Sequence, residues 1–194
     1  MKKIQDHYFK EARKQGYVAR SAFKLEEMDR KFRLLRRGQH VMDLGCAPGS
    51  WLQYAAKKVL PEGSLTGVDL KQVKIQFPEG VRIFQCDIYM LEESILASSR
   101  FDLVLSDMAP DTTGIPSVDS QRSYDLNSQA LSFAQRHLKP GGTLVLKAFQ
   151  GEPLNRLKSE IRACFESLKL FKPKSSRSES VEIFVLGFGL LPQS

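Results

Sequence analysis

The segment DLGCAPGSW, Asp43 to Trp51, follows an apolar run and places two glycines and a proline directly before a helical pattern. Glycines in such a turn let a ligand approach the backbone closely. A dinucleotide fingerprint would read G-x-G-x-x-G and would hold a pyrophosphate at the helix N-terminus. Here the order is D-x-G-x-x-P-G, bracketed by Gly45 and Gly49, and the leading Asp43 would repel phosphate. The segment therefore predicts a positively charged ligand without phosphate.

Two further carboxylates follow the next apolar segments. Asp69 lies 24 residues beyond Gly45, where an acidic residue in nucleotide-binding folds accepts hydrogen bonds from ribose hydroxyls. Asp87, in QCDI, is expected near the exocyclic amine of an adenine. A single aspartate at a strand end often only caps a turn or a helix. Three of them beside one glycine loop favour a ligand, and S-adenosylmethionine, which has an adenosine, a sulfonium and no phosphate, fits this arrangement.

A lysine with a different chemistry lies late in the run TLVLKAF. Lys147 interrupts an otherwise apolar segment, and such a local break of pattern tends to be functional. The alternative is a lysine at a strand end whose ammonium reaches solvent. Asp107, directly after the apolar run FDLVLS, is a second candidate at the same edge.

These residues need elements to position them, and hydrophobic periodicity predicts strands that alternate with helices. The predicted strands are HVMDLG (40–45), SLTGVDL (64–70), VRIFQCDI (81–88), FDLVLSD (101–107), TLVLKAF (143–149), LKLF (168–171) and VEIFVLGFGLL (181–191). The predicted helices span 4–15, 20–34, 50–60, 90–99, 120–138 and 153–168, and KPGG (139–142) is expected to stop the fifth of them.

Strands that are apolar on both faces and alternate with helices indicate a mostly parallel sheet covered on both sides. We predict an open, doubly wound α/β fold with seven strands. The loop between the last two strands is too short for a crossover helix, so these strands should form an antiparallel hairpin. In such folds ligands bind at the carboxyl ends of the strands, where the candidate residues lie.

Length and composition indicate one domain over residues 1–194, with 42% apolar residues and no composition break that would mark a linker. The net charge is +7, and residues 1–37 alone hold 12 Lys and Arg against 5 Asp and Glu, whereas residues 38–194 hold 17 of each. A basic excess confined to one segment predicts a polyanion-binding extension, for which nucleic acid is favoured over a membrane surface.

Several functional classes are not supported. Three dispersed cysteines, Cys46, Cys86 and Cys164, indicate reduced thiols rather than disulfides or a zinc site. The histidines His7, His40 and His137 are scattered, so we predict no metal site. No secretion signal or membrane-spanning run is visible, and we expect a cytoplasmic monomer.

The sequence resembles the RrmJ/FtsJ family of ribose 2′-O-methyltransferases. The resemblance lies in RSAFKL (20–25), DLGCAPGSW (43–51), LSDMAP (105–110), GGTLVLKAFQG (141–151) and SSRSESVEIFVL (175–186), in the family's order and spacing. It implies a Rossmann-like class I methyltransferase fold with S-adenosylmethionine as cofactor. It also implies cofactor-binding residues and a catalytic tetrad: Gly49, Trp51, Asp69, Asp87 and Asp107 for the cofactor, and Lys24, Asp107, Lys147 and Glu182 for catalysis.

The resemblance gives the lysines a role that agrees with elementary chemistry. A ribose hydroxyl is a weak nucleophile and must lose its proton as it attacks the methyl group. A lysine can accept that proton if burial and a second nearby lysine disfavour its charged form. We expect Lys147 to be the base, Lys24 to position the ribose oxygen, and Asp107 and Glu182 to orient the two lysines. Glu182 is preferred over Glu179 because it starts the last apolar strand.

The expected substrate is RNA, because the chemistry requires a 2′-hydroxyl, and DNA is excluded for the same reason. A uridine of large-subunit ribosomal RNA, within the ribosomal subunit, is the favoured target. The alternatives are a ribose of a tRNA anticodon loop and a non-catalytic RNA-binding assembly factor. A nicotinamide-dependent oxidoreductase is disfavoured by the missing middle glycine.

Overall fold

The computed structural model describes residues 2–90, 100–177 and 179–192. The chain divides into two compact units. Unit 1 comprises residues 1–91 and 173–180, and unit 2 comprises residues 92–172 and 181–194. Each unit has its own strands and helices, and the single domain predicted over residues 1–194 stays a prediction.

Unit 1 contains three parallel strands in the order β3-β2-β1. Val41 and Leu44 of β1 and Leu65 of β2 are buried, whereas β3 is partly exposed along its length. The helix α3 begins after Gly49 and ends one residue before the Leu60-Pro61 pair, as the sequence predicts. The elements are α1 (Lys2–Lys14), α2 (Ala22–Phe32), β1 (His40–Leu44), α3 (Ser50–Val59), β2 (Ser64–Asp69), β3 (Val81–Gln85) and a single 3-10 turn (Ile88–Met90).

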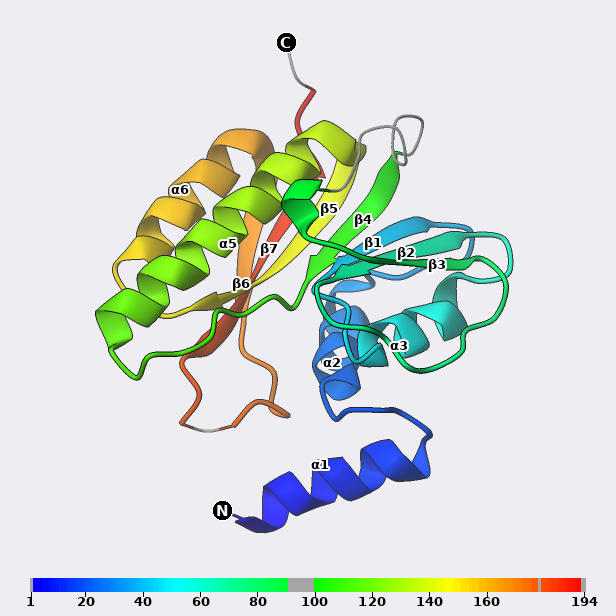
Figure 1. The fold of residues 1–194 in the computed structure, drawn as a ribbon. Coiled ribbons are helices and arrows are strands. Elements are labelled where there is room, and N and C mark those ends of the chain that lie inside the picture. The colour runs from blue at the N-terminus through cyan, green and yellow to red at the C-terminus, as the bar shows by residue number, and fades with distance from the viewer. Residues whose placement is uncertain (1, 91–99, 178, 193–194) are drawn as a thin grey trace. The chain divides into compact units, whose positions relative to one another are not determined.

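Unit 2 contains four strands in the order β4-β5-β7-β6. β4 and β5 are parallel, and β7 runs antiparallel to both β5 and β6, which confirms the predicted hairpin. The helices α5 and α6 lie side by side against these strands (Figure 1). The elements are β4 (Phe101–Ser106), α5 (Pro116–His137), β5 (Leu138–Phe149), α6 (Pro153–Cys164), β6 (Phe165–Phe171) and β7 (Glu182–Leu190).

Three predicted boundaries in unit 2 are wrong. α5 starts at Pro116 rather than near residue 120, because proline is well suited to the first turn of a helix. The KPGG segment lies inside β5, where the register shifts between the pairs Phe101–Leu138 and Leu103–Thr143. This irregularity accommodates residues 139–142, and Gly141 takes a φ of 79° there.

The third boundary concerns the helix predicted over residues 153–168. α6 ends at Cys164, and residues 165–171 form β6 as one unbroken strand. Pairing of β6 with β7, from Phe165–Leu190 to Phe171–Phe184, outweighs the helical pattern of the sequence. The helix predicted over 90–99 falls almost entirely on residues 91–99, which lie outside the described residues.

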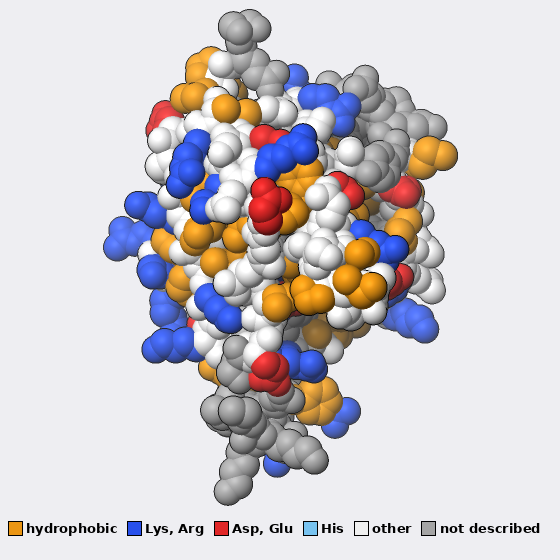
Figure 2. All heavy atoms as spheres, turned by 90° about the vertical axis from the view of Figure 1, so that its left-hand side faces the viewer, with side chains coloured by type: hydrophobic (Ala, Val, Ile, Leu, Met, Phe, Trp, Pro, Cys, Tyr) orange, Lys and Arg blue, Asp and Glu red, His pale blue; other side chains and the backbone are white. Residues whose placement is uncertain are grey.

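The described residues form seven strands, which together with their mostly parallel pairing and the flanking helices confirm the predicted α/β fold class. None of the described helices is long and apolar enough to cross a membrane. On the face shown in Figure 2, Lys and Arg side chains are interspersed with hydrophobic and acidic ones.

Candidate active site

The glycine loop of unit 1 follows β1 and returns the chain into α3. The amides of Gly45 and Cys46 both donate to the carbonyl oxygen of Val68, at 2.8 and 3.1 Å, so the loop is anchored to the end of β2. Gly49 has a φ of 107°, and a Cβ placed there would lie 2.9 Å from Ile75 and 3.0 Å from Phe77. A side chain at Gly49 is therefore excluded both by the backbone conformation and by space.

Asp69, the last residue of β2, holds this loop from the side. Its Oδ2 accepts the amide of Ala47 at 2.8 Å, and its Oδ1 accepts the amide of Lys71 at 2.8 Å. Each carboxylate oxygen has two lone pairs, so Asp69 keeps capacity to accept a further donor such as a hydroxyl. Sequence reasoning anticipated the position of Asp69 but not its bond to the loop backbone.

The loop lies in an acidic environment. Asp43, the fourth residue of β1, is only 1% exposed. The pKa of the neighbouring Cys46 thiol is raised, first by burial and then by the negative charges of Asp43 and Asp69. Asp87 is half-buried two residues after the end of β3, and burial together with Asp87 likewise raises the pKa of Cys86. The carboxylates Asp43, Asp69 and Asp87, rather than the burial, favour a cationic ligand here and disfavour a phosphate.

Trp51 has an unexpected role in unit 1. Its indole is 2% exposed, and its Nε1 donates to the carbonyl oxygen of Ser21 at 2.8 Å. The same oxygen accepts the amide of Lys24 at 3.0 Å, and the Ser21 and Ser50 hydroxyls bond at 2.7 Å. Trp51 thus ties the start of α3 to the turn that carries Lys24, whose side chain is buried. The ring is turned into the protein, and its contact with a cofactor stays a prediction.

In unit 2 the predicted lysine and aspartate meet. Lys147 Nζ lies 2.9 Å from Asp107 Oδ1 and also donates to the main-chain oxygen of Asp107. The Lys147 side chain is 7% exposed and that of Asp107 is 20% exposed. Asp107 directly follows β4, which is parallel to β5, so the two residues come from the same edge of the strands. The ion pair fixes the lysine nitrogen at the carboxyl end of β4.

The pairing of β5 with β7 determines where Glu182 lies relative to Lys147. Lys147 pairs with Phe184 and Phe149 pairs with Glu182 across the antiparallel β5 and β7. Residues directly opposite each other, and residues two apart along a strand, share one face of a sheet. Lys147 and Glu182 therefore lie on the same face, two positions apart. Glu179, the alternative acid, belongs to the segment 173–180 of unit 1.

The structure thus assembles the predicted residues into two groups. Unit 1 contains Lys24, Asp43, Gly45, Gly49, Trp51, Asp69 and Asp87, and unit 2 contains Asp107, Lys147 and Glu182. Within the described residues, no three His, Cys, Asp or Glu side chains gather as a metal site would require.

Sequence reasoning missed two carboxylates that organise loops beside these groups. Glu27 of α2 accepts the amides of Lys174 and Ser175 at 2.7 and 2.9 Å. Asp119 of α5 accepts the amides of Thr113 and Gly114 at 2.7 and 3.1 Å. Asp119 has a sequence signal, because an acidic residue in the first turn of a helix stabilises its N-terminus. Glu27 has no such sequence signal, because its partners Lys174 and Ser175 lie almost 150 positions further along the chain.

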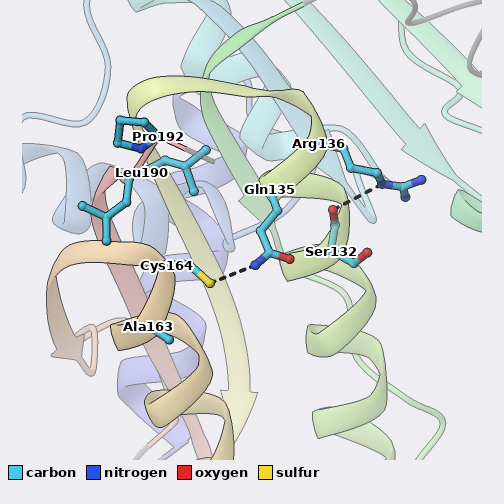
Figure 3. A pocket seen from close by; sticks show the side chains of 8 residues that line it. Ser132, Gln135, Arg136, Ala163, Cys164, Leu190 and Pro192 are labelled. Carbon is cyan, nitrogen blue, oxygen red and sulfur yellow. Dashed lines mark hydrogen bonds between the residues drawn. The ribbon is translucent and has the colours of Figure 1, made fainter. Parts of the chain in front are cut away.

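Unit 2 contains a cavity of about 380 Å³ that is lined by residues from the ends of α5, α6 and β7 (Figure 3). Gln135 and Arg136, which line it, belong to the last turn of α5 and precede the start of β5, whereas Lys147 is close to the end of that strand. Inside the cavity Gln135 Nε2 donates to Cys164 Sγ at 2.8 Å. The cavity is therefore separate from the candidate active site.

Comparison with known proteins shows which family this chain resembles. The model of the family described as FtsJ-like methyltransferase matches residues 17–190. A protein of Desulfatibacillum aliphaticivorans named ribosomal RNA large subunit methyltransferase E is 46% identical over 186 residues, which cover 95% of this chain and 90% of that protein. Its namesake in Syntrophobacter fumaroxidans is 44% identical over 190 residues and 96% of both chains.

Solved structures of methyltransferases are also similar to this chain. A Plasmodium falciparum protein described as a ribosomal RNA methyltransferase superposes with a TM-score of 0.80 at 28% identity, covering 91% of this chain and all of that one. Human methyltransferase-like protein 13, solved with S-adenosylhomocysteine, shares the fold with a TM-score of 0.58 at 14% identity, covering 80% of this chain and 73% of that one. Since the family match includes the glycine loop, Lys24 and the Asp107, Lys147 and Glu182 group, the chain belongs to the FtsJ-like methyltransferase family.

Proposed function

We propose that this protein transfers a methyl group from S-adenosylmethionine to the ribose 2′-hydroxyl of a uridine in large-subunit (23S) ribosomal RNA. The observation that carries the proposal is the buried Lys147, ion-paired with Asp107 on the face that also bears Glu182. A strand-end lysine held in this way keeps its nitrogen at a fixed position, which proton transfer to or from a bound ribose requires. The names of the relatives, which cover nearly the whole chain, support the large ribosomal subunit and do not favour tRNA.

The residues of the glycine loop fit S-adenosylmethionine, the cofactor of the family. Asp43, Gly45, Gly49, Asp69 and Asp87 would hold it, together with Asp107 and the start of α3 at Trp51. The negative charges of Asp43 and Asp69, which add to burial in raising the pKa of Cys46, would stabilise a sulfonium, and Asp69 retains acceptor capacity for a hydroxyl. When bound, the cofactor supplies a methyl group on positively charged sulfur.

We assign the proton transfer to unit 2. In its neutral form, Lys147 Nζ would accept the proton of the 2′-hydroxyl while the ribose oxygen bonds to the methyl carbon and the bond from that carbon to the cofactor sulfur breaks, which leaves S-adenosylhomocysteine. Asp107 orients the lysine through its carboxylate and its main-chain oxygen. Glu182 supplies a second carboxylate on the same face. Lys24 is assigned to the positioning of the ribose oxygen.

RNA binding is assigned to the basic segment over residues 1–37 and to the loop that contains Lys172, Lys174 and Arg177. Contacts to phosphates would orient the strand without reading its sequence. We further propose that residues 1–194 act as one methyltransferase domain, as a monomer in the cytoplasm, on the ribosomal particle rather than on naked RNA.

The test uses labelled S-adenosylmethionine with three substrates: isolated large ribosomal subunits lacking the modification, naked large-subunit RNA, and bulk tRNA. We expect label as 2′-O-methyluridine in the subunit, mapped by mass spectrometry, with less in naked RNA and none in tRNA. The initial rate should fall steeply with salt. Label confined to tRNA, or no label in any RNA, would contradict the proposal.

A further inference from the structure

β5, the strand that carries Lys147, pairs with β4 only up to the residue before Lys147. β4 pairs with β5 only as far as Ser106, which lies opposite Leu146. On the other side, β7 continues along β5 to the pair Phe149–Glu182. Among the residues that the structure describes, 147–149 therefore have a strand on one side only, and the backbone groups on their other side need different partners.

Two buried side chains of α5 provide these partners. Asn127 Nδ2 donates to the main-chain oxygen of Lys147 at 3.0 Å, and the amide of Phe149 donates to Ser123 Oγ at 3.0 Å. Ser123 and Asn127 are one helical turn apart and are each 2% exposed. Asn127 Nδ2 also donates to the main-chain oxygen of Ser123 at 2.8 Å, which ties the pair to the helix itself.

The polar character of these two positions is not explained by packing. The same buried side of α5 carries Ala130, Leu131 and Ala134 further along, which pack without polar atoms. A buried hydroxyl or amide is unfavourable unless it is hydrogen-bonded, and here both groups are satisfied by the end of β5. Ser123 and Asn127 thus replace the missing strand neighbour at the residue that carries the reactive amine.

We propose that Ser123 and Asn127 are positioning residues for Lys147. By holding the Lys147 carbonyl and the Phe149 amide, they keep the end of β5 in register with β7. The lysine nitrogen then stays at Asp107 and on the face of Glu182. The functional part of this inference rests on the proposed role of Lys147 in methyl transfer, whereas the placement of β5 does not.

The test compares the double variant Ser123→Ala/Asn127→Leu with Ser123→Thr, which keeps the hydroxyl. Displacing a reacting group by about 1 Å costs on the order of 100-fold in rate. We expect kcat of the double variant to fall between about 10-fold and 100-fold, with KM for S-adenosylmethionine and for RNA within about twofold. The pH profile of kcat should move, because the contact of Lys147 with Asp107 changes, and Ser123→Thr should retain most of the activity.

A matched control separates positioning from simple loss of stability. Phe133→Leu changes the same helix at its other end, where the ring of Phe133 is tilted against that of Phe101 with 6.3 Å between the ring centroids. Well below its melting temperature this variant should keep the wild-type kcat and pH profile. A folded double variant with wild-type kcat and pH profile would overturn the inference.

Hydrogen exchange gives a second readout that does not depend on activity. In Ser123→Ala alone, the Phe149 amide loses its acceptor and should exchange at least about tenfold faster than in the wild type, while the amides of β4 keep their rates. If the double variant does not fold, or if the wild type methylates no RNA, the exchange rate in Ser123→Ala still tests whether Ser123 holds the end of β5 in place. An unchanged exchange rate at Phe149 would refute it.

Discussion

The two units of the molecule place their functional side chains by different means. In unit 1 the candidate ligand-binding residues lie on loops and helix starts, and side chains hold the backbone in place: Asp69 binds the amides of Ala47 and Lys71. In unit 2 the candidate reactive residues lie in or directly after strands, and the registers of β4, β5 and β7 bring Asp107, Lys147 and Glu182 to one edge.

This difference suits the tasks proposed for the two units. Loops held by single carboxylates can present several backbone amides and carboxylate oxygens to a ligand, and they respond strongly to the loss of one charge. Strands fix side-chain direction over many hydrogen bonds, and where β4 has ended, Ser123 and Asn127 hold the part of β5 that carries the reactive amine. Substitutions in the glycine loop of unit 1 should therefore change binding, and those of the reactive residues in unit 2 should change the rate of transfer.

The largest effect is expected for Lys147→Ala. Loss of a general base lowers the rate by about 100-fold to 10,000-fold. We expect a fall in single-turnover methyl transfer within that range at every pH, with the affinity for S-adenosylhomocysteine, measured by calorimetry, unchanged. Lys147→Arg should not restore the rate, because a guanidinium does not give up its proton in a protein. Wild-type turnover of Lys147→Ala across the pH range would exclude this residue as the base.

A smaller effect, on binding rather than on rate, is expected for Asp69→Asn. Asparagine has only one acceptor oxygen, so either the Ala47 or the Lys71 amide would face an NH₂ group instead. Hydrogen bonds to charged groups contribute about 1.5–3 kcal/mol, which corresponds to a loss of affinity between about 10-fold and about 150-fold. The dissociation constant for S-adenosylmethionine should rise more than that for S-adenosylhomocysteine, which lacks the sulfonium charge.

Glu79→Gln is the matched control for Asp69→Asn. Glu79 is an exposed acid of the same unit, and its loss changes net charge equally. If both substitutions weakened S-adenosylmethionine binding by the same factor, the effect would come from overall charge and not from the glycine loop.

Much of both units was accessible from the sequence because it depends on local pattern. The glycine loop, the strand-end aspartates and the break that Lys147 makes in an apolar run are all visible within about ten residues. Glu182 could be preferred over Glu179 because it begins an apolar strand, and the register of β7 with β5 places it on the face of Lys147. The family resemblance supplied the grouping of these residues, which no single segment contains.

The features that escaped prediction depend on pairing between distant segments. Residues 165–168 form a strand because β7 lies alongside them, and residues 139–142 are absorbed in β5 because β4 resumes pairing at Leu103. The roles of Asn127 and Ser123 follow from where β4 ends relative to β5. Hydrophobic periodicity does not show where one strand ends relative to its neighbour. These contacts could therefore be identified only from the three-dimensional structure.

A moderate effect on substrate binding is expected for Glu27→Gln. Both oxygens of Glu27 hold the loop of residues 173–180, through the amides of Lys174 and Ser175. Glutamine can accept only one of these bonds, which should loosen a loop that carries basic side chains. We expect KM for RNA to rise about fivefold with kcat unchanged. The neighbouring Glu26→Gln removes the same charge but only a solvent-exposed pair with Arg30, and should leave KM unchanged.

The smallest effect concerns Asp119, the carboxylate of unit 2 that holds a loop in the manner of unit 1. The pKa of Asp119 lies below its ordinary value of 3.8, chiefly because the Thr113 amide donates to it, with further bonds from the Thr113 hydroxyl and the Gly114 amide. A carboxylate with a lowered pKa stabilises the folded state above its unfolded pKa, and this contribution disappears as the pH falls through the folded pKa.

Asp119→Asn should therefore lower the melting temperature by a few degrees at pH 7, and the difference from the wild type should shrink below about pH 4. Asp125→Asn, on the exposed side of the same helix, should show no such dependence. A difference that persisted unchanged at pH 3 would mean that the Asp119 side chain acts through its shape and not through its charge. If the difference disappears as expected, loops in both units are held by charged acceptors. The contrast between the units then lies in the strand register that positions Lys147, and not in how their loops are secured.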